Sequence, residues 1–389
     1  MPSGSTASTV CLCRRCWSGS AKSCGCCSRP PLPRSWSRPR TCGGSCSVPG
    51  TPIGNGRGPA DDPVHPSDRT GKTCMNYHDL FERNYGVFTE EEQDRIRRTR
   101  ILIVGDSGTG ETLSVLLARC GFERFTLFGE RTYTKGDMNR QIGCFLDTIG
   151  TPKIVQMEKM IRSINPAAEV SGSQHLPGEA QLDALVQDAD LVIPAVEDLS
   201  YSILIFRCAK KHAKPALLCM PSGSMGWVSV FTKDTPTIED VFGIPPLSYK
   251  GLRRMMHTRE YRCAQYTFIT SGDWRVPWFW DYFLDKRPLA LICTTEWMAV
   301  SLAALEALKV ATHTWNPTLA PKCWYLRRGR VSRSHFSLFV KYHRKLGWLI
   351  FGQGVGKAMH KLTHLFWGSF FRILRSWQTR KEQKSPDQP

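Results

Sequence analysis

A glycine-rich stretch, Gly105-Asp-Ser-Gly-Thr-Gly110, has residue types and spacing that point directly to chemistry. Glycines in such a turn let the chain bend tightly, let backbone N–H groups approach a phosphate, and let the next helix pack on the preceding strand. Gly105 and Gly110 stand at the first and third of these positions. At the second position, immediately before Gly108, Ser107 replaces the expected glycine. The pattern indicates nucleotide binding, with a purely structural strand-to-helix turn as the alternative.

Four acidic residues follow predicted strands and are expected to surround the same crevice. They are Asp106, Glu130, Glu197 and Asp198. Ligands of doubly wound sheets bind outside the carboxyl ends of the strands, which is where these side chains should gather. The alternative for Glu197 and Asp198 is that they cap the helix predicted to follow them.

The elements around the glycine-rich turn have the order of a nucleotide-binding βαβ unit. Residues 101–104 form a short apolar run typical of a buried parallel strand, and residues 113–118 continue at helical period. A second strand is predicted at 125–128. Upstream, Thr89 and Glu92 have the spacing of a capping box, which predicts a helix running to about residue 98.

Further strands and helices alternate along the chain. Helices are predicted at 152–164, 181–187 and 200–212, and strands at 169–171, 190–196 and 215–219. Alternating β and α segments favour parallel sheets covered on both faces. We therefore predict an α/β fold with a doubly wound, mostly parallel Rossmann-like sheet.

Three short motifs, taken with the glycine-rich turn, resemble those of one enzyme family. They are Met138-Asn-Arg-Gln141, Gly150-Thr-Pro-Lys153 and Asn165-Pro166, and they occur in the order and spacing found in the E1-like ThiF/MoeB/HesA adenylyltransferases. Residues 301–309 are similar to a late core helix of that family, and 81–84 to its N-terminal arginine segment. The resemblance covers roughly residues 77–312.

This resemblance implies an ATP- and Mg²⁺-dependent enzyme that adenylates a carboxylate, often the C-terminal glycine of a ubiquitin-like carrier protein, and releases pyrophosphate. Cations must then face the α-phosphate, which gains negative charge during attack. By resemblance, Arg140 and Lys153 are the phosphate-binding cations and Asn139 contacts the nucleotide. Arg83 would reach the site of the partner subunit in a homodimer, and Glu197, with Asp198 beside it, would hold Mg²⁺.

Each of these positions also has a simpler interpretation. Arg140 could be a surface ion-pair partner, Lys153 a solvated lysine at a helix N-terminus, and Arg83 part of a solvated helix. The sequence also departs from the family pattern. Gly129 replaces the usual ribose-binding aspartate with Glu130 one residue away, and Glu197 replaces the usual aspartate. The alternatives to an enzyme are a catalytically impaired homologue used for binding or scaffolding, and a nicotinamide-dependent oxidoreductase.

The cysteines do not favour a zinc site. Eight of the 16 lie within residues 1–50, among them Cys11, Cys13, Cys16, Cys24, Cys26 and Cys27, and no histidine appears before His65 to complete a mixed ligand set. No Cys-x-x-Cys pair follows, so we predict no zinc and a reduced, cytoplasmic protein. Cys293 precedes a predicted helix and Cys263 lies in a basic stretch. Either could accept a carrier as a thioester, although free cysteines are usually buried apolar residues.

The formal net charge of +18 is concentrated at the two ends of the chain. Residues 1–74 hold 10 basic and 3 acidic residues, and 322–389 hold 15 and 2, whereas 75–321 hold 27 and 29. A nearly neutral body argues against a nucleic-acid-binding fold, because phosphate binding needs a basic face on the folded domain. We therefore predict a leader at 1–74, an adenylation domain at 75–321 and a basic extension at 322–389.

The two terminal segments and one internal segment have distinct compositions. The leader is rich in Ser, Pro, Arg and Gly and is predicted to be disordered, or to precede the true start at Met75. Residues 353–377 carry apolar side chains at steps of 3 and 4 with basic residues between them, which predicts an amphipathic helix. It would contact a membrane surface peripherally, or dock on the body or on a partner protein. The aromatic stretch 244–290 is predicted either to recognise substrate or to pack on itself.

Overall fold

The computed structural model describes residues 76–256, 274–275, 278, 281–282 and 286–336, together with Ser369, Ile373 and Ser376. The predicted leader and nearly all of the predicted amphipathic helix lie outside these residues. Within the described part of the chain, no helix is both long enough and apolar enough to cross a lipid bilayer.

One eight-stranded sheet, in the order β3-β2-β1-β4-β5-β6-β7-β8, organises the described chain. The five parallel strands are β1 (Arg100–Val104), β2 (Arg124–Phe128), β3 (Glu169–Ser173), β4 (Leu191–Pro194) and β5 (Ala216–Ser222). The antiparallel strands are β6 (Met225–Phe231), β7 (Lys322–Arg327) and β8 (Arg330–His335). Strand order reverses between β1 and β4, which is the switch point where doubly wound sheets bind ligands.

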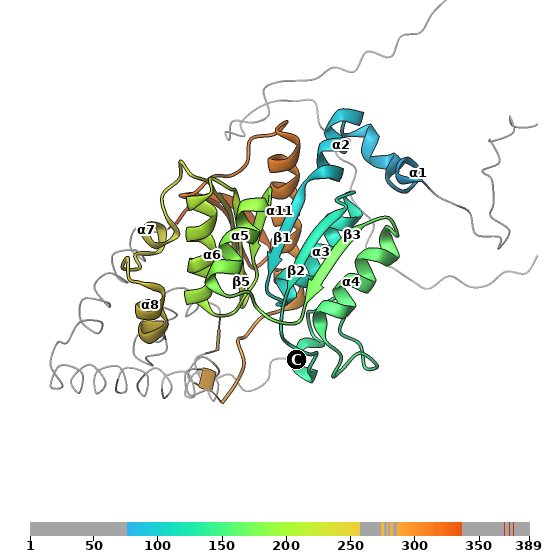
Figure 1. Cartoon of the computed structure of the whole chain (residues 1–389). Helices are drawn as coiled ribbons and strands as arrows, with labels where there is room; N and C mark the ends of the chain where they lie inside the picture. Colours follow the sequence, from blue (N-terminus) through green and yellow to red (C-terminus); the bar gives the residue numbers. More distant parts are fainter. Residues whose placement is uncertain are drawn as a thin grey trace, which may run out of the picture. The chain divides into compact units, whose positions relative to one another are not determined.

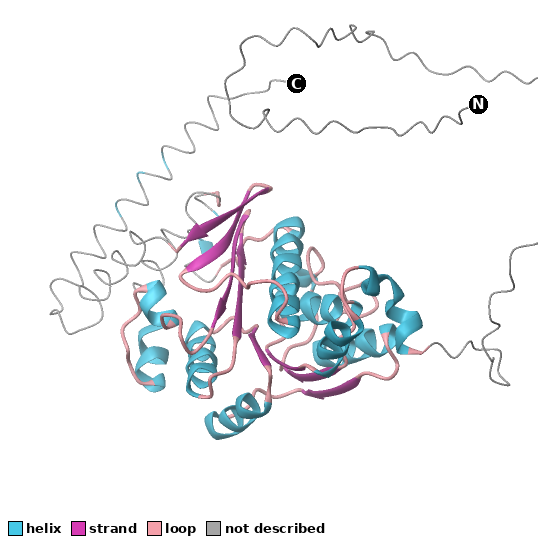
Figure 2. Cartoon of the chain, turned by 90° about the horizontal axis from the view of Figure 1, so that it is seen from above, coloured by secondary structure: helices cyan, strands magenta, loops and turns pink. Residues whose placement is uncertain are grey.

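Helices cover both faces of this sheet (Figures 1 and 2). One face packs against α2 (Glu90–Arg98), α3 (Gly108–Arg119), α4 (Lys153–Ile164) and α11 (Cys293–Thr312). The other packs against α5 (Glu179–Asp188), α6 (Leu199–Lys211), α7 (Ile238–Phe242) and α8 (Tyr249–Met256). Strand β1 supplies both cores because its side chains alternate: Ile101 and Ile103 point to one, and Leu102 and Val104 to the other. The predicted α/β fold with a mostly parallel sheet is confirmed.

The local signals that begin the predicted elements act as expected. The Thr89 hydroxyl accepts a hydrogen bond from the Glu92 backbone N–H, and the Glu92 carboxylate accepts one from the Thr89 backbone N–H, so α2 begins with a capping box. Before it lie the short α1 (Tyr77–Phe81) and the 3-10 helix η1 (Glu82–Gly86), and η2 (Lys135–Asp137) follows β2.

The sheet continues beyond the predicted boundary at residue 321. Strand β7 pairs with β6 through Met225 to Arg327 and Val228 to Trp324, and β8 pairs with β7. Residues 322–335 therefore belong to the sheet of the body, and the boundary predicted from charge falls two strands too early. The basic residues of β8 are exposed, so the strand can carry them within the sheet. Net charge along the sequence therefore does not mark the end of the body.

Candidate functional site

The turn between β1 and α3 is shaped by close approach to the neighbouring strand. Gly105 has a φ of +116°, and a Cβ there would lie 2.2 Å from the carbonyl oxygen of Ala195. A side chain at position 105 is therefore excluded both by conformation and by space. Ser107 serves as the N-cap of α3, its hydroxyl accepting from the Gly110 N–H at 3.4 Å. Ser107 therefore caps α3 at the position where a glycine was expected.

A cavity of about 370 Å³ opens at this turn, at the switch point between β1 and β4. Its lining includes Ser107, Gly108 and Thr109 at the N-terminus of α3, Arg140, and Glu197 after β4. A helix N-terminus presents free N–H groups and partial positive charge, which suits an anion. The cavity therefore combines the α3 N-terminus with one guanidinium group.

Arg140 is held in place by groups on two sides. Its Nη1 donates to the Gly136 carbonyl oxygen at 2.7 Å, and its Nη2 lies 3.3 Å from Asp137 Oδ1. Its Nε lies 3.6 Å from Oε2 of Glu296, which comes from the first turn of α11. Asn139 is exposed beside it and donates to the Leu291 carbonyl oxygen at 3.0 Å. The structure therefore places Arg140 in the cavity lining with Asn139 next to it, and their predicted contacts with a nucleotide stay predictions.

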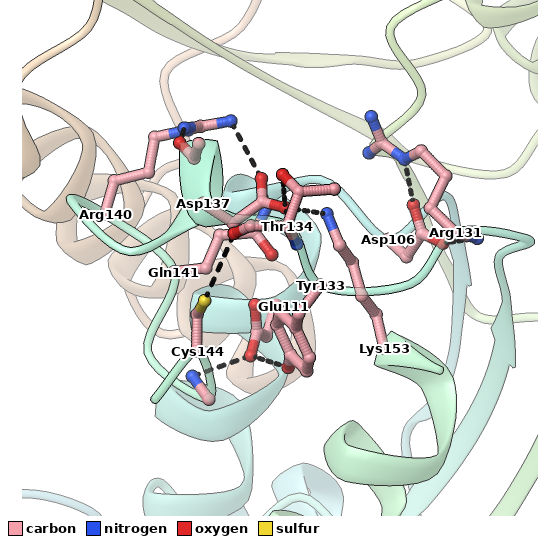
Figure 3. Close-up of polar contacts among 12 residues, drawn as sticks. Asp106, Glu111, Arg131, Tyr133, Thr134, Asp137, Arg140, Gln141, Cys144 and Lys153 are labelled. Carbon is pink, nitrogen blue, oxygen red and sulfur yellow. Dashed lines mark hydrogen bonds and ion pairs between the residues drawn. The ribbon is translucent and has the colours of Figure 1, made fainter. Parts of the chain in front are cut away.

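Lys153 lies deeper than Arg140. Its side chain is only 2% exposed, and its Nζ is 3.1 Å from Oδ2 of Asp137 (Figure 3). Burial would raise the pKa of Asp137, but hydrogen bonds from Thr134 and the charge of Lys153 outweigh it and lower that pKa. Asp137 joins Lys153 to Arg140, so the two predicted phosphate cations share one buried carboxylate, which belongs to none of the sequence motifs.

Two buried glutamates flank these cations. Glu111 of α3 accepts a short hydrogen bond from the Tyr133 hydroxyl and one of 2.7 Å from the Gly143 N–H (Figure 3). Glu296 lies against the α3 N-terminus, since a Cβ on Gly108 would be 2.2 Å from its Oε1. Burial raises the pKa of each carboxyl to about 7. The sequence offered no signal for Glu296, because only the packing of α11 brings it to the loop.

Asp106 forms an ion pair with Arg131, a residue outside the sequence motifs. Its side chain is 3% exposed and accepts from the Arg131 backbone N–H at 2.7 Å and from Arg131 Nε at 2.6 Å. The other arm of that guanidinium, Nη1, lies 2.6 Å from Glu197 Oε1. The negative charge beside the glycine-rich turn is therefore compensated within the chain.

The remaining predicted site residues have separate positions. Asp198 is the N-cap of α6 and accepts from the Ser200 N–H at 2.8 Å. Glu130 is exposed after β2. Arg83 is exposed in η1, near the end of α3 opposite the phosphate loop, about 18 Å along that helix at 1.5 Å per residue. Its predicted action in a partner's site stays a prediction, as do the metal-binding roles of Glu197 and Asp198.

The cysteines of the described chain lie apart from one another and from any cluster of metal-binding side chains. No group of three or more His, Cys, Asp or Glu side chains there has the arrangement of a metal site. Cys293 begins α11, and burial together with nearby Glu296 raises the pKa of its thiol, which disfavours the reactive thiolate. Cys263 lies outside the described residues.

Comparisons with known proteins agree on one family. The ThiF family profile matches residues 81–344. Protein HesA of Nostoc sp. is 22% identical over 233 residues, covering 60% of this chain and 79% of the relative. Molybdopterin-synthase adenylyltransferase of Escherichia coli is 29% identical over 113 residues, 29% of this chain and 45% of the relative.

The solved structures show the same fold. E. coli MccB, the microcin C7 biosynthetic enzyme, in complex with N-formylated MccA has a TM-score of 0.52 at 15% identity, covering 67% of this chain and 74% of that one. MccB with ATP has a TM-score of 0.51 at 15% identity, over 66% and 71%. With a family match over most of its length and the site geometry above, the chain belongs to the ThiF family of E1-like proteins.

Proposed function

We propose that this protein is an ATP-dependent adenylyltransferase that activates a carboxylate as an acyl-adenylate. The observation that carries the proposal is the cavity at the switch point, which is lined by both the α3 N-terminus and Arg140. These are the two kinds of group that stabilise a phosphate. ATP binding is typical of the family, whereas the carboxylate substrate belongs to the proposal alone.

The proposed reaction places its charge beside the hydrogen-bond donors that line the cavity. A carboxylate oxygen of the substrate attacks the α-phosphorus of ATP, the bond to the pyrophosphate oxygen breaks, and acyl-adenylate and pyrophosphate result. Negative charge on the α-phosphate rises in the transition state, so Arg140 and the N–H groups of Gly108 and Thr109 would act as preorganised donors. Asp137 and Glu296 would hold the guanidinium in that orientation.

Lys153 has a different role in this proposal. Because it is buried against Asp137, we assign it to positioning Arg140 through that carboxylate. Replacement by methionine would remove the closer of the two cations that pair with the buried Asp137 and leave only Arg140 at 3.3 Å, which is destabilising. Lys153→Met should therefore lower both the exchange rate and the unfolding temperature, whereas Arg140→Ala should lower mainly the rate.

The direct test is exchange of labelled pyrophosphate into ATP in the presence of candidate carboxylates, including small proteins with a C-terminal glycine. Arg140→Ala should slow exchange by about 10²-fold or more, as loss of one transition-state donor does. Arg98→Ala is the matched control, because Arg98 is exposed on α2 and, among the described residues, forms its ion pair with Asp94 at 2.9 Å. Equal exchange in both variants would refute the role of Arg140.

Two alternatives give distinct results in the same experiments. ATP binding without exchange for any carboxylate would favour a catalytically impaired binding module. The observation that favours a binding module is that, in the described chain, Asp137 already pairs with both Arg140 and Lys153. Binding of NADH without binding of ATP would favour an oxidoreductase.

A homodimer is part of the proposal because Arg83 lies far from its own phosphate loop. If Arg83 acts in the partner's site, the Arg83→Ala and Arg140→Ala variants should each have low exchange activity alone. Mixing the two variants should restore activity, since some mixed dimers keep one intact site. No recovery on mixing, in a sample shown to exchange subunits, would argue against that role.

A further inference from the structure

One guanidinium group bridges the carboxyl ends of β1 and β4 in this protein. Arg131 Nε lies 2.6 Å from Asp106 Oδ1, and its Nη1 lies 2.6 Å from Glu197 Oε1. Burial would lower the pKa of Arg131, but the two carboxylates outweigh it and raise that pKa. Figure 3 shows Asp106 and Arg131 meeting at this edge, apart from the cluster around Asp137. The bridge therefore places a fixed positive charge beside the cavity, which Glu197 lines.

The bridge depends on the absence of a side chain at position 129. A Cβ on Gly129 would lie 2.5 Å from Asp106 Cβ and 2.6 Å from its Oδ2. The Asp106 side chain thus occupies the space that a side chain at 129 would need. Asp106, Gly129 and Arg131 form one compensated set, in which a carboxylate at the end of β1 takes the place of one at the end of β2.

The same contacts leave the acidic residues poorly suited to hold Mg²⁺. Glu197 is paired with Arg131 through Oε1, both Asp106 oxygens accept from Arg131, and Asp198 caps α6 through Oδ1. A magnesium ion needs oxygen ligands that are free to coordinate it. The donor set in the described chain therefore does not fit a protein-held Mg²⁺.

We propose that Arg131 takes the place of a protein-bound divalent cation, so that this site binds ATP without a metal ion coordinated by Glu197. The inference rests on the proposed ATP site. An arginine can serve there because its guanidinium is always charged and forms paired hydrogen bonds to carboxylate or phosphate.

Calorimetric titration of the full chain with ATP, in excess Mg²⁺ and in excess EDTA, tests this. We expect the wild type to bind ATP less than about threefold more weakly in EDTA than in Mg²⁺. The Arg131→Met variant should bind ATP about tenfold or more weakly in EDTA than in Mg²⁺, because Mg²⁺ restores part of its affinity. Two uncompensated carboxylates would then face the phosphates unless Mg²⁺ joined them. Arg98→Met is the control. A wild-type loss of about tenfold or more in EDTA overturns the proposal.

Arg131→Lys guards against a variant that fails to fold, because it retains a cation beside the buried Asp106. It should behave as the wild type, and a metal requirement equal to that of a folded Arg131→Met would count against a charge-bridging role. A second readout needs no nucleotide. Electron paramagnetic resonance of added Mn²⁺ should show the same bound fraction for wild type and Glu197→Gln. Mn²⁺ bound by the wild type and lost in Glu197→Gln would refute the inference, whereas absence of ATP binding alone would refute only the proposed function.

Discussion

Glu296→Gln should stabilise the protein at high pH and have little such effect at low pH. Glu296 is 1% exposed, and burial raises the pKa of its carboxyl from an ordinary value of 4.5 to about 7. Between these values the folded state retains a proton that the unfolded state has released, so stability falls as pH rises through the window. Glutamine stays neutral and avoids this loss.

The rise in pKa from 4.5 to about 7 corresponds to about 3 kcal/mol, and near-complete burial keeps solvent screening small. The free energy of unfolding of the variant minus that of the wild type should therefore increase by about 3 kcal/mol from pH 4.5 to pH 8. Any steric cost of the amide against Gly108 is the same at both pH values and cancels in this difference.

Urea unfolding of wild type, Glu296→Gln and Glu179→Gln at the two pH values measures the effect. Glu179 lies on the exposed first turn of α5, so Glu179→Gln reports the background of the same chemical change at the surface. A difference between Glu296→Gln and wild type that is constant with pH would refute the proton linkage at Glu296.

Three other substitutions test the packing of the site by urea unfolding. Gly129→Ala should lower the free energy of unfolding by about 1–3 kcal/mol because the new Cβ meets Asp106. In an Asp106→Gly background the same substitution should cost less than half as much, and equal costs in both backgrounds would exclude the contact. Tyr133→Phe should cost about 1.5–3 kcal/mol through loss of its hydrogen bond to Glu111, and an unchanged midpoint would contradict that bond. Asp198→Ala should cost about 1 kcal/mol as a lost helix cap, with Asp198→Ser restoring most of it.

Local signals identified the elements around the loop because their causes lie within a few residues. The Thr89 and Glu92 side chains close the α2 capping box across three positions, and an apolar run predicts β1 from its own composition. The glycine-rich motif was enough to identify Gly105, although its close approach to Ala195 explains why no other residue fits there. Resemblance likewise brought Arg140 into view without knowledge of its partners.

The pairing of charges could be decided only by the tertiary structure. Asp106 and Arg131 are 25 residues apart and meet because β1 and β2 are parallel, with Val104 in register with Phe128. Glu296 reaches the phosphate loop because α11 packs beside α3. Sequence distance carries no information about such contacts. The fold therefore makes the carboxylate at Asp106 and the glycine at 129 parts of one compensated arrangement.

By itself, the sequence determined the order of elements, the glycine-rich turn and the family, because these depend on local composition and short motifs. The tertiary structure decided which predicted cation lines the cavity and which is buried, because that depends on the positions of Asp137 and of the surrounding helices. It also decided that β7 and β8 complete the sheet, since strand pairing is a long-range hydrogen-bonding choice that net charge does not report.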